Sequence, residues 1–145
     1  MTDTTCSFED IKSFIAHKTG VSEKEITPTS DIVYDIGCCG DDLENLMNAY
    51  AKQFKVDIKS YLWYFHTEEE GHSNSIGRIF FKPPYERVKH IPVTPNLLVK
   101  SANEGKWLLT YPEHQLPKRR YDILINLIII ILLIVLTIYK CANGK

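Results

Sequence analysis

The apolar positions between residues 41 and 55 repeat with the spacing of one helix face. They fall at i, i+3, i+4, i+7 and i+11 and are Leu43, Leu46, Met47, Tyr50 and Phe54. This stripe predicts an amphipathic helix that buries one side. Asp41 and Asp42 stand where the helix begins, where a carboxylate can cap free N–H groups. Lys52 and Lys55 stand near the other end, where cations are favoured.

Two further helices are predicted, one on each side of this one. The first starts at Ser7, which forms a capping-box-like pair with Asp10, and it ends near Gly20. Its apolar face consists of Phe8, Ile11, Phe14 and Ile15. The second starts at Thr94, which is followed by a proline in the first turn, and it ends at Gly105.

The segments between these helices are less regular. Residues 21–37 are predicted to form a long loop with a turn-rich middle. Residues 76–81 are interpreted as a short strand or extended segment, which Pro83 and Pro84 would stop. We therefore expect a mainly α fold, consisting of a small helical bundle with a short extended insertion and one C-terminal transmembrane helix.

Nearly every residue from Ile123 to Tyr139 is Ile, Leu or Val. A helix of this length spans about 26 Å, close to the ~30 Å hydrocarbon core of a bilayer. A domain this small has no interior able to surround such a helix, so we expect it to cross a membrane. The expected organisation is a bundle over 1–112, a basic juxtamembrane linker over 113–122, the span over 123–139 and a short tail over 140–145.

Charges on the two sides of the span favour one orientation. Lys118, Arg119 and Arg120 precede it, whereas Lys140 and Lys145 follow it. This bias favours a cytoplasmic position for the bundle. The N-terminal sequence MTDTTCSFED lacks the basic and apolar regions of a secretory signal. We therefore expect a tail-anchored, single-pass protein of the cell inner membrane whose soluble domain is cytoplasmic.

Charge is distributed unevenly along the chain. Residues 1–72 contain 14 acidic and 6 basic side chains, a net charge of −8, whereas residues 73–122 contain 4 and 9, a net charge of +5. The acidic part suits a surface that meets basic partners, and the basic part suits anionic lipid headgroups. With a near-neutral pI, neither pattern is typical of nucleic-acid binding.

The stretch from Gly20 to Ile58 carries a family resemblance. GVSEKEITPTSDIVYDIG, the predicted helix and FKVDI together resemble an acyl carrier protein, with Asp35-Ile36-Gly37 at the family's Asp-Leu-Gly turn. The chain is also similar to a group of short bacterial acyl-carrier-like proteins of unknown function. The resemblance covers roughly the first 60 residues. Gly40 occupies the position of the serine that carries phosphopantetheine in that family, so we expect no bound cofactor.

The resemblance implies that the helix from residue 41 onwards presents a surface for partner proteins. The partner-binding residues expected there are Asp35, Asp41, Asp42 and Glu44. Because all four are acidic, the expected partner is a basic protein. No Ser/His/Asp set, Walker loop, dinucleotide fingerprint or zinc-ligand quartet occurs in the sequence, so an enzyme is not expected.

Two groups of residues could in principle support chemistry. Cys38 and Cys39 precede the helix, where a thiol pKa can be lowered, but nearby aspartates oppose this, and we interpret both as small structural residues. His66, Glu68–Glu70 and His72 offer nitrogen and oxygen ligands, but their spacing matches no strong metal motif. We expect a solvated loop there and no metal.

These patterns lead to an expectation about function. The chain is predicted to be a membrane-tethered, acyl-carrier-like interaction module without a prosthetic group, which docks partners through its acidic second helix. One alternative is a working acyl carrier whose acyl group or cofactor is borne on Cys38 or Cys39. Another is a small bitopic membrane regulator in which the span itself does the work.

Overall fold

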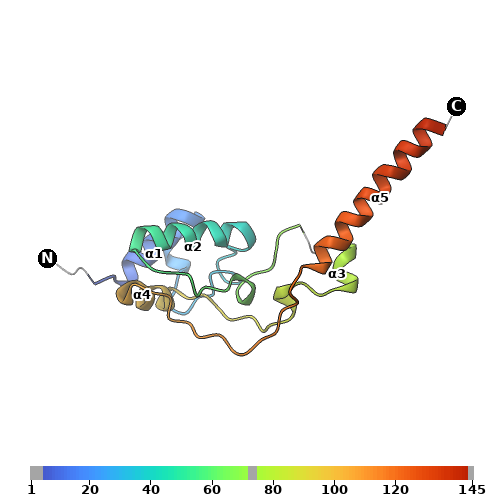
Figure 1. The fold of residues 1–145 in the computed structure, drawn as a ribbon. Coiled ribbons are helices and arrows are strands. Elements are labelled where there is room, and N and C mark those ends of the chain that lie inside the picture. Colours follow the sequence, from blue (N-terminus) through green and yellow to red (C-terminus); the bar gives the residue numbers. More distant parts are fainter. Residues whose placement is uncertain (1–4, 72–74, 144–145) are drawn as a thin grey trace.

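The computed structural model describes residues 5–71 and 75–143. Within these ranges the chain forms five α-helices and no strand. The helices are α1 (Phe8–Thr19), α2 (Gly40–Phe54), α3 (Ile76–Phe80), α4 (Pro95–Glu104) and α5 (Tyr121–Asn143), with short 3-10 helices η1 (Glu23–Glu25), η2 (Trp63–Phe65) and η3 (Pro84–Glu86). Helices α1, α2 and α4 form a body, and α5 extends away from it beside α3 (Figure 1).

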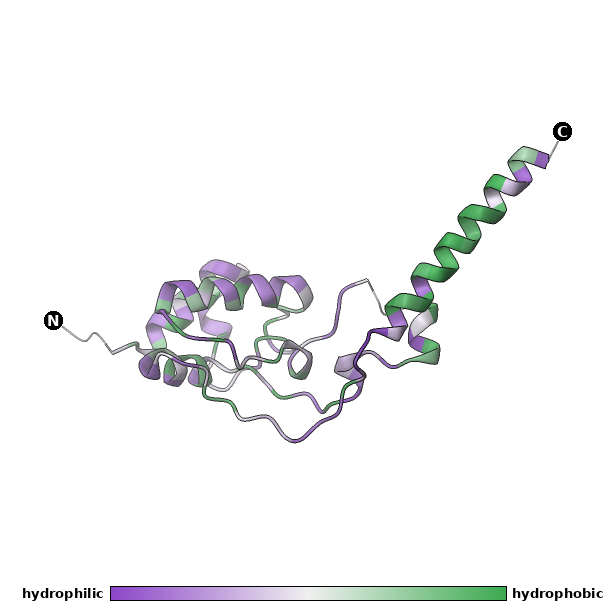
Figure 2. Cartoon of the chain, in the orientation of Figure 1, coloured by the Kyte–Doolittle hydropathy of each residue, from purple (hydrophilic) through white to green (hydrophobic). Residues whose placement is uncertain are grey.

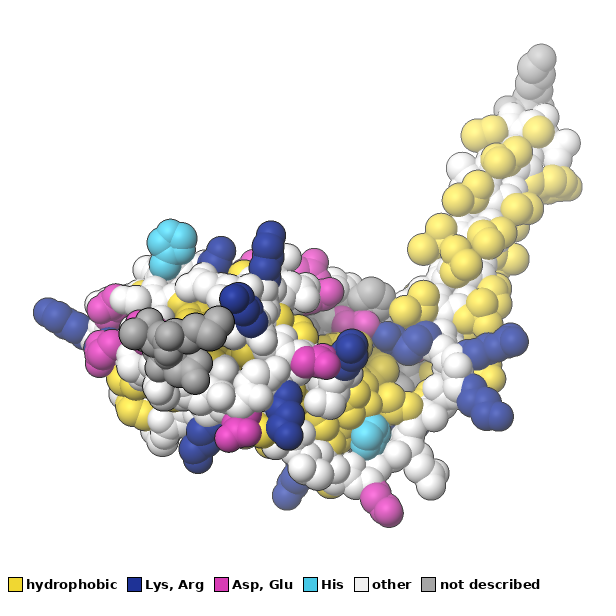
Figure 3. Space-filling model, turned by 60° about the vertical axis from the view of Figure 1, so that its left-hand side comes forward, with side chains coloured by type: hydrophobic (Ala, Val, Ile, Leu, Met, Phe, Trp, Pro, Cys, Tyr) yellow, Lys and Arg dark blue, Asp and Glu magenta, His cyan; other side chains and the backbone are white. Residues whose placement is uncertain are grey.

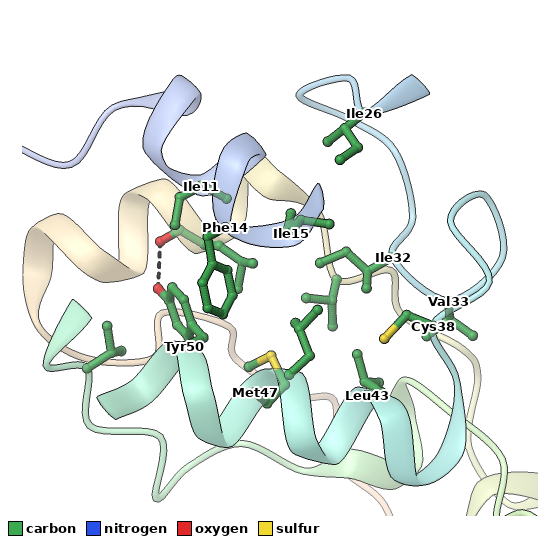
Figure 4. Packing of buried hydrophobic residues seen from close by; sticks show 14 of the residues in the cluster. Ile11, Phe14, Ile15, Ile26, Ile32, Val33, Cys38, Leu43, Met47 and Tyr50 are labelled. Atoms are coloured by element: carbon green, nitrogen blue, oxygen red, sulfur yellow. Dashed lines mark hydrogen bonds between the residues drawn. The ribbon is translucent and has the colours of Figure 1, made fainter. Parts of the chain in front are cut away.

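The body is held together by the apolar faces of its three helices. The stripe predicted for α2 is confirmed, since Leu43, Leu46, Met47 and Tyr50 are buried and Phe54 packs against the same cluster. Ile11, Phe14 and Ile15 of α1 face them across the core (Figure 4). The Tyr50 hydroxyl donates a hydrogen bond of 2.6 Å to the carbonyl of Leu98 and so ties α2 to α4 (Figure 4).

Helix ends follow the sequence signals at α1 and α4. Ser7 and Asp10 form a complete capping box, and the Thr94 side chain accepts a hydrogen bond from the backbone N–H of Leu97. At α2 the prediction was wrong in detail. The helix starts at Gly40, and Asp41 and Asp42 lie inside its first turn rather than capping it. Their carboxylates still face the positive end of the helix dipole.

The segment predicted to be extended, residues 76–81, is instead the short helix α3. Ser75 caps it by accepting a hydrogen bond from the N–H of Arg78 at 3.3 Å. A helix of five residues is too short to be stable alone in water. It persists here because it packs along the first turns of α5.

Helix α5 is long and apolar enough to cross a membrane. It extends beyond the predicted span of 123–139 at both ends and consists almost entirely of apolar residues (Figure 2). Most of its apolar side chains are exposed. This exposure excludes the role of a core helix. Lys140 lies in its last turn, and Lys145 lies outside the described residues.

Candidate functional site: an acidic groove beside α2

A groove of about 480 Å³ opens between α2 and the loop that follows η2. Five acidic side chains surround it: Asp41, Glu44, Glu68, Glu69 and Glu70. Apolar side chains also line it, and they are Met47, Ile58, Tyr61 and Trp63. None of the described residues that line the groove is basic. The groove therefore combines an apolar surface with a ring of negative charge.

Helix α2 contributes one wall through its spacing. Asp41, Glu44 and Asn48 stand three and four residues apart, so they share a face that points away from the core. Met47 is 1% exposed and connects this face to the core. The amphipathic period that buries one side of α2 thus also aligns the two carboxylates along the groove.

The opposite wall is the acidic loop after η2, which is attached directly to the start of α2. The backbone N–H of Gly40 donates a hydrogen bond of 2.8 Å to the Thr67 hydroxyl. Gly40 has φ +54°, and a Cβ at this position would overlap the side chain of Glu70. The positive φ favours glycine here, and a larger residue would also displace the side chain of Glu70.

One guanidinium group joins this loop to α5. Arg120 donates two hydrogen bonds to the carboxylate of Glu69, at 2.7 and 2.6 Å. It also donates to Asp122 in the first turn of α5, at 3.0 and 2.6 Å. Asp122 is 4% exposed, so Arg120 neutralises a carboxylate that the fold has buried. The groove wall and the apolar helix therefore share a single cation.

Aromatic rings support the floor of the groove. Tyr61 stacks on His66 with centroids 5.0 Å apart and an interplanar angle of 7°, and it meets the edge of Trp107 at 5.3 Å. Its hydroxyl oxygen is buried without a hydrogen-bond partner among the described residues. Burial raises the pKa of Tyr61, so this side chain is neutral in the groove.

Beneath Tyr61 lies a network of hydrogen bonds around His66. Its Nδ1 lies 2.6 Å from the Ile91 carbonyl, which can only accept, so Nδ1 carries the proton and Nε2 accepts from the Tyr111 hydroxyl at 2.7 Å. The same Tyr111 oxygen accepts hydrogen bonds from Leu62 N–H and Trp107 Nε1–H. Burial lowers the pKa of His66 to about 4, so its imidazole is neutral at neutral pH.

The four predicted partner-binding residues do not form one surface. Asp41 and Glu44 lie in the groove. Asp42 faces a separate hollow of about 240 Å³, together with Lys18. The carboxylate of Asp35 accepts a hydrogen bond of 2.7 Å from the N–H of Asp31, which places it within the long loop.

The two adjacent cysteines differ in their surroundings. Cys38 is 5% exposed and belongs to the core cluster. Burial, reinforced by Asp42 and then Cys39, raises the pKa of Cys38 to about 11, so its thiol stays protonated at neutral pH. Cys39 is exposed and precedes α2 without making a side-chain cap. Cys38 is therefore a structural residue of the core.

The acidic loop around Glu68–Glu70, which was predicted to be a solvated loop, forms one wall of the groove. Sequence reasoning missed Tyr61, Trp63, Glu69 and Arg120 as parts of one site. The available signal was the direct succession of an aromatic run and an acidic run in residues 61–70. Of the metal candidates, His66 is committed to the hydrogen bonds described above, and His72 lies outside the described residues. The described residues contain no cluster of three or more potential metal ligands.

Comparison with known proteins corrects the family resemblance. No solved structure matches the chain. No acyl carrier protein family matches it either, so that assignment was wrong. Two features that suggested this resemblance have explanations within this fold. The apolar stripe of α2 packs into the protein's own core, and Gly40 leaves space for the side chain of Glu70. A family model does match residues 8–110, more than two thirds of the chain. The chain therefore belongs to that family, which is described as "Protein of unknown function (DUF1493)".

Proposed function

We propose that this protein is a membrane-anchored interaction module whose acidic groove binds a cationic, partly apolar segment of a partner protein. The observation that supports this most strongly is the groove itself, in which five carboxylates surround Tyr61 and Trp63. One of the five, Glu69, is already engaged by Arg120. A partner that brings lysine or arginine would neutralise Asp41, Glu44 and Glu68, which line the same groove.

The two kinds of lining have separate roles in this proposal. The carboxylates attract a basic partner and set the rate and specificity of encounter more than the affinity. Partly exposed aromatic rings are the side chains that most often supply binding energy at protein interfaces, and Tyr61 and Trp63 occupy that position here. The expected ligand is therefore a segment in which basic residues flank an apolar one.

We further propose that α5 anchors this module in the cell inner membrane as a single span, with the body on the cytoplasmic side. The basic residues Lys118, Arg119 and Arg120 before the helix support this orientation. Anchoring would confine the groove to the membrane surface and raise its effective concentration toward partners that are held there.

Trp63 provides a direct test, because it lines the groove. The full chain in nanodiscs is titrated with a short peptide of alternating lysine and leucine while tryptophan fluorescence is recorded. We expect saturable binding that weakens as salt is added. The double variant Glu44→Lys/Glu68→Lys should weaken binding by at least about fivefold, since one exposed ion pair contributes up to about 1 kcal/mol.

The matched control is Glu104→Lys, which reverses an exposed charge at the end of α4, away from the groove. It should bind the peptide like the unmodified chain. A peptide of alternating glutamate and leucine should not bind. Equal binding of both peptides, or equal weakening by Glu104→Lys, would exclude the groove as the binding site.

A replacement of residues 127–139 by an unrelated apolar sequence separates this proposal from a regulator that acts through its span. The interaction module should retain peptide binding and membrane attachment after the exchange. Loss of peptide binding after the exchange would favour the span as the functional element.

A further inference from the structure

Helix α3 presents apolar side chains to its surroundings. Ile79 and Phe80 are 79% and 67% exposed, and Ile76 and Phe81 are also exposed. Four large apolar residues within six positions form a patch that is unusual on a surface that faces water, and such patches are typical of protein or membrane contacts. The patch therefore requires a partner that covers it.

The patch is continuous with the apolar surface of α5. Phe81 and Tyr121 pack ring against ring with centroids 5.4 Å apart. Gly77 touches the backbone of α5 so closely that a Cβ would overlap the Asp122 carbonyl. Figure 1 shows α3 beside the first turns of α5, and Figure 2 shows apolar residues on both. The environment that contacts the first turns of α5 therefore also contacts α3.

Two backbone N–H groups and the charged side chain of α3 are satisfied within the protein. The N–H of Gly77 donates a hydrogen bond of 2.7 Å to the side-chain oxygen of Asn126, a polar residue inside the apolar helix. The N–H of Arg78 is capped by Ser75, and the Arg78 side chain forms an ion pair with Glu86. Internal satisfaction of backbone and charged groups is the condition for placing a segment in a lipid environment.

Exposed basic residues lie close to α3 and α5 in the sequence. Lys82 and Arg87 follow α3, and Lys118 and Arg119 precede α5; all four residues are exposed. Figure 3 shows Lys and Arg side chains gathered where the apolar helix leaves the body. This arrangement matches the layers of a bilayer surface, in which anionic headgroups lie above acyl chains.

We propose that α3 and Phe81 form a second membrane contact, inserted at the headgroup and acyl boundary of the bilayer that α5 crosses, with the four basic residues against anionic phospholipid headgroups. The contact between Gly77 and Asn126 fixes how deep α3 lies in the bilayer relative to α5. Asn126 lies four residues beyond Asp122, about 6 Å along α5. The inference rests on α5 being in a bilayer and is independent of what the groove binds. It fixes the body against the membrane at two points instead of one.

Photo-crosslinking in the full chain tests this contact. The photoreactive analogue p-benzoylphenylalanine replaces Phe80, or Tyr34 as an equally exposed control on the body, or Ile131 as a control within α5. The variants are produced in cells and irradiated in their own membranes, and adducts are identified by mass spectrometry. We expect phospholipid adducts at positions 80 and 131 and none at position 34.

Each other result would overturn the inference in a distinct way. A lipid adduct at position 131 without one at position 80 would keep the anchor and remove α3 from the membrane. A protein adduct at position 80 would replace the bilayer by a protein partner. Absence of a lipid adduct at position 131 would remove the anchor itself, and the inference with it. None of these outcomes affects peptide binding in the groove.

Reconstitution in vesicles tests the basic residues. The position 80 variant is irradiated in phosphatidylcholine vesicles with and without phosphatidylglycerol. We expect a several-fold higher yield of lipid adducts with the anionic lipid, and loss of this increase in Lys118→Glu/Arg119→Glu. Lys52→Glu, an exposed change on α2, should retain the increase. Equal yields in both vesicles would show that the headgroup charge has no role.

Discussion

His66 is a buried, neutral imidazole whose two nitrogens are both occupied. One donates to Ile91 and the other accepts from Tyr111, so a second proton would replace an accepted hydrogen bond by a repulsion between two donors. Burial, which disfavours the charged imidazolium, is the main reason that its pKa in the folded protein falls to about 4 from the ordinary 6.5. The folded state loses stability whenever the unfolded state can bind a proton that the folded state cannot.

We expect the free energy of unfolding to be pH-dependent through His66. The stabilisation that comes from the neutral His66 is fully present above pH 6.5. It falls as the pH drops from 6.5 toward 4 and is lost below pH 4, which lowers the free energy of unfolding by about 3 kcal/mol in total. Urea titrations of the full chain in detergent micelles, followed by tryptophan fluorescence, measure it. His66→Asn should be less stable and should lack this part of the pH slope.

His17→Gln is the matched control, since it removes an exposed histidine at the end of α1. It should retain the pH slope of the unmodified chain. A slope that is unchanged in His66→Asn would assign the pH dependence to other groups.

Cys38 and Cys39 should differ in reactivity although they are neighbours. A pKa of about 11 leaves Cys38 with a roughly hundredfold smaller thiolate fraction than the ordinary value of 9.0 would, and burial restricts access further. In the folded protein, iodoacetamide should modify Cys39 and spare Cys38. Peptide sequencing by mass spectrometry distinguishes them, and both should react in urea. Equal labelling in the folded protein would contradict the buried position of Cys38.

Among the elements, α2 and α4 are joined by a hydrogen bond that can be removed without changing side-chain shape. Tyr50→Phe deletes the donor to Leu98 and should lower the free energy of unfolding by about 1 kcal/mol. Tyr34→Phe, on an exposed tyrosine, should have no measurable effect. Equal stability of Tyr50→Phe and the unmodified chain would mean that this bond contributes nothing beyond the packing of the ring.

The contact between α3 and α5 depends on the absence of a side chain at Gly77. Gly77→Ala places a Cβ against the Asp122 carbonyl and should detach α3. The N–H of Phe81, bonded to Gly77 oxygen at 2.9 Å, should then exchange rapidly with deuterium in nanodiscs. Ile79→Ala removes an exposed side chain and should keep this amide protected. Unchanged protection in Gly77→Ala would show that α3 does not need the close approach.

The sequence predicted α1 and α2 from their periodic apolar patterns, α4 from its end signals, and α5 from a nearly uniform apolar run. It failed at α3, because a five-residue helix is stabilised by α5, 49 positions away along the chain at the Gly77–Asn126 contact, rather than by its own residues. The resemblance of Gly20–Ile58 to acyl carriers misled for a related reason. An amphipathic helix after a glycine turn is common to many small helical bodies.

The groove was predictable only in part. Asp41 and Glu44 were predicted only through the resemblance to acyl carriers, which the comparisons contradict. The opposite wall could not be derived, because the acidic loop reaches α2 through Thr67 and through Arg120, a residue 51 positions beyond Glu69. Pairing over such distances depends on the tertiary fold, and local patterns do not encode it.

At the scale of the whole molecule, Arg120 connects the groove to α5. Arg120→Gln should release residues 67–71 and leave Asp122 without its cation, at a cost of about 2 kcal/mol. Faster hydrogen exchange in the amides of this loop would report the release. Arg119→Gln, a change of the exposed neighbour, should leave the exchange unchanged. Equal exchange in both variants would show that Arg120 is not needed to hold the loop.

The bond between Gly77 and Asn126 also has a consequence for the order of folding. The body is completed by contacts among residues 6–111, whereas the helix against which α3 packs most extensively is α5. Closing a loop of this length early would cost entropy that a five-residue helix cannot repay. We therefore expect a two-stage maturation in which the body folds first and α3 takes its helical form after α5 enters the bilayer.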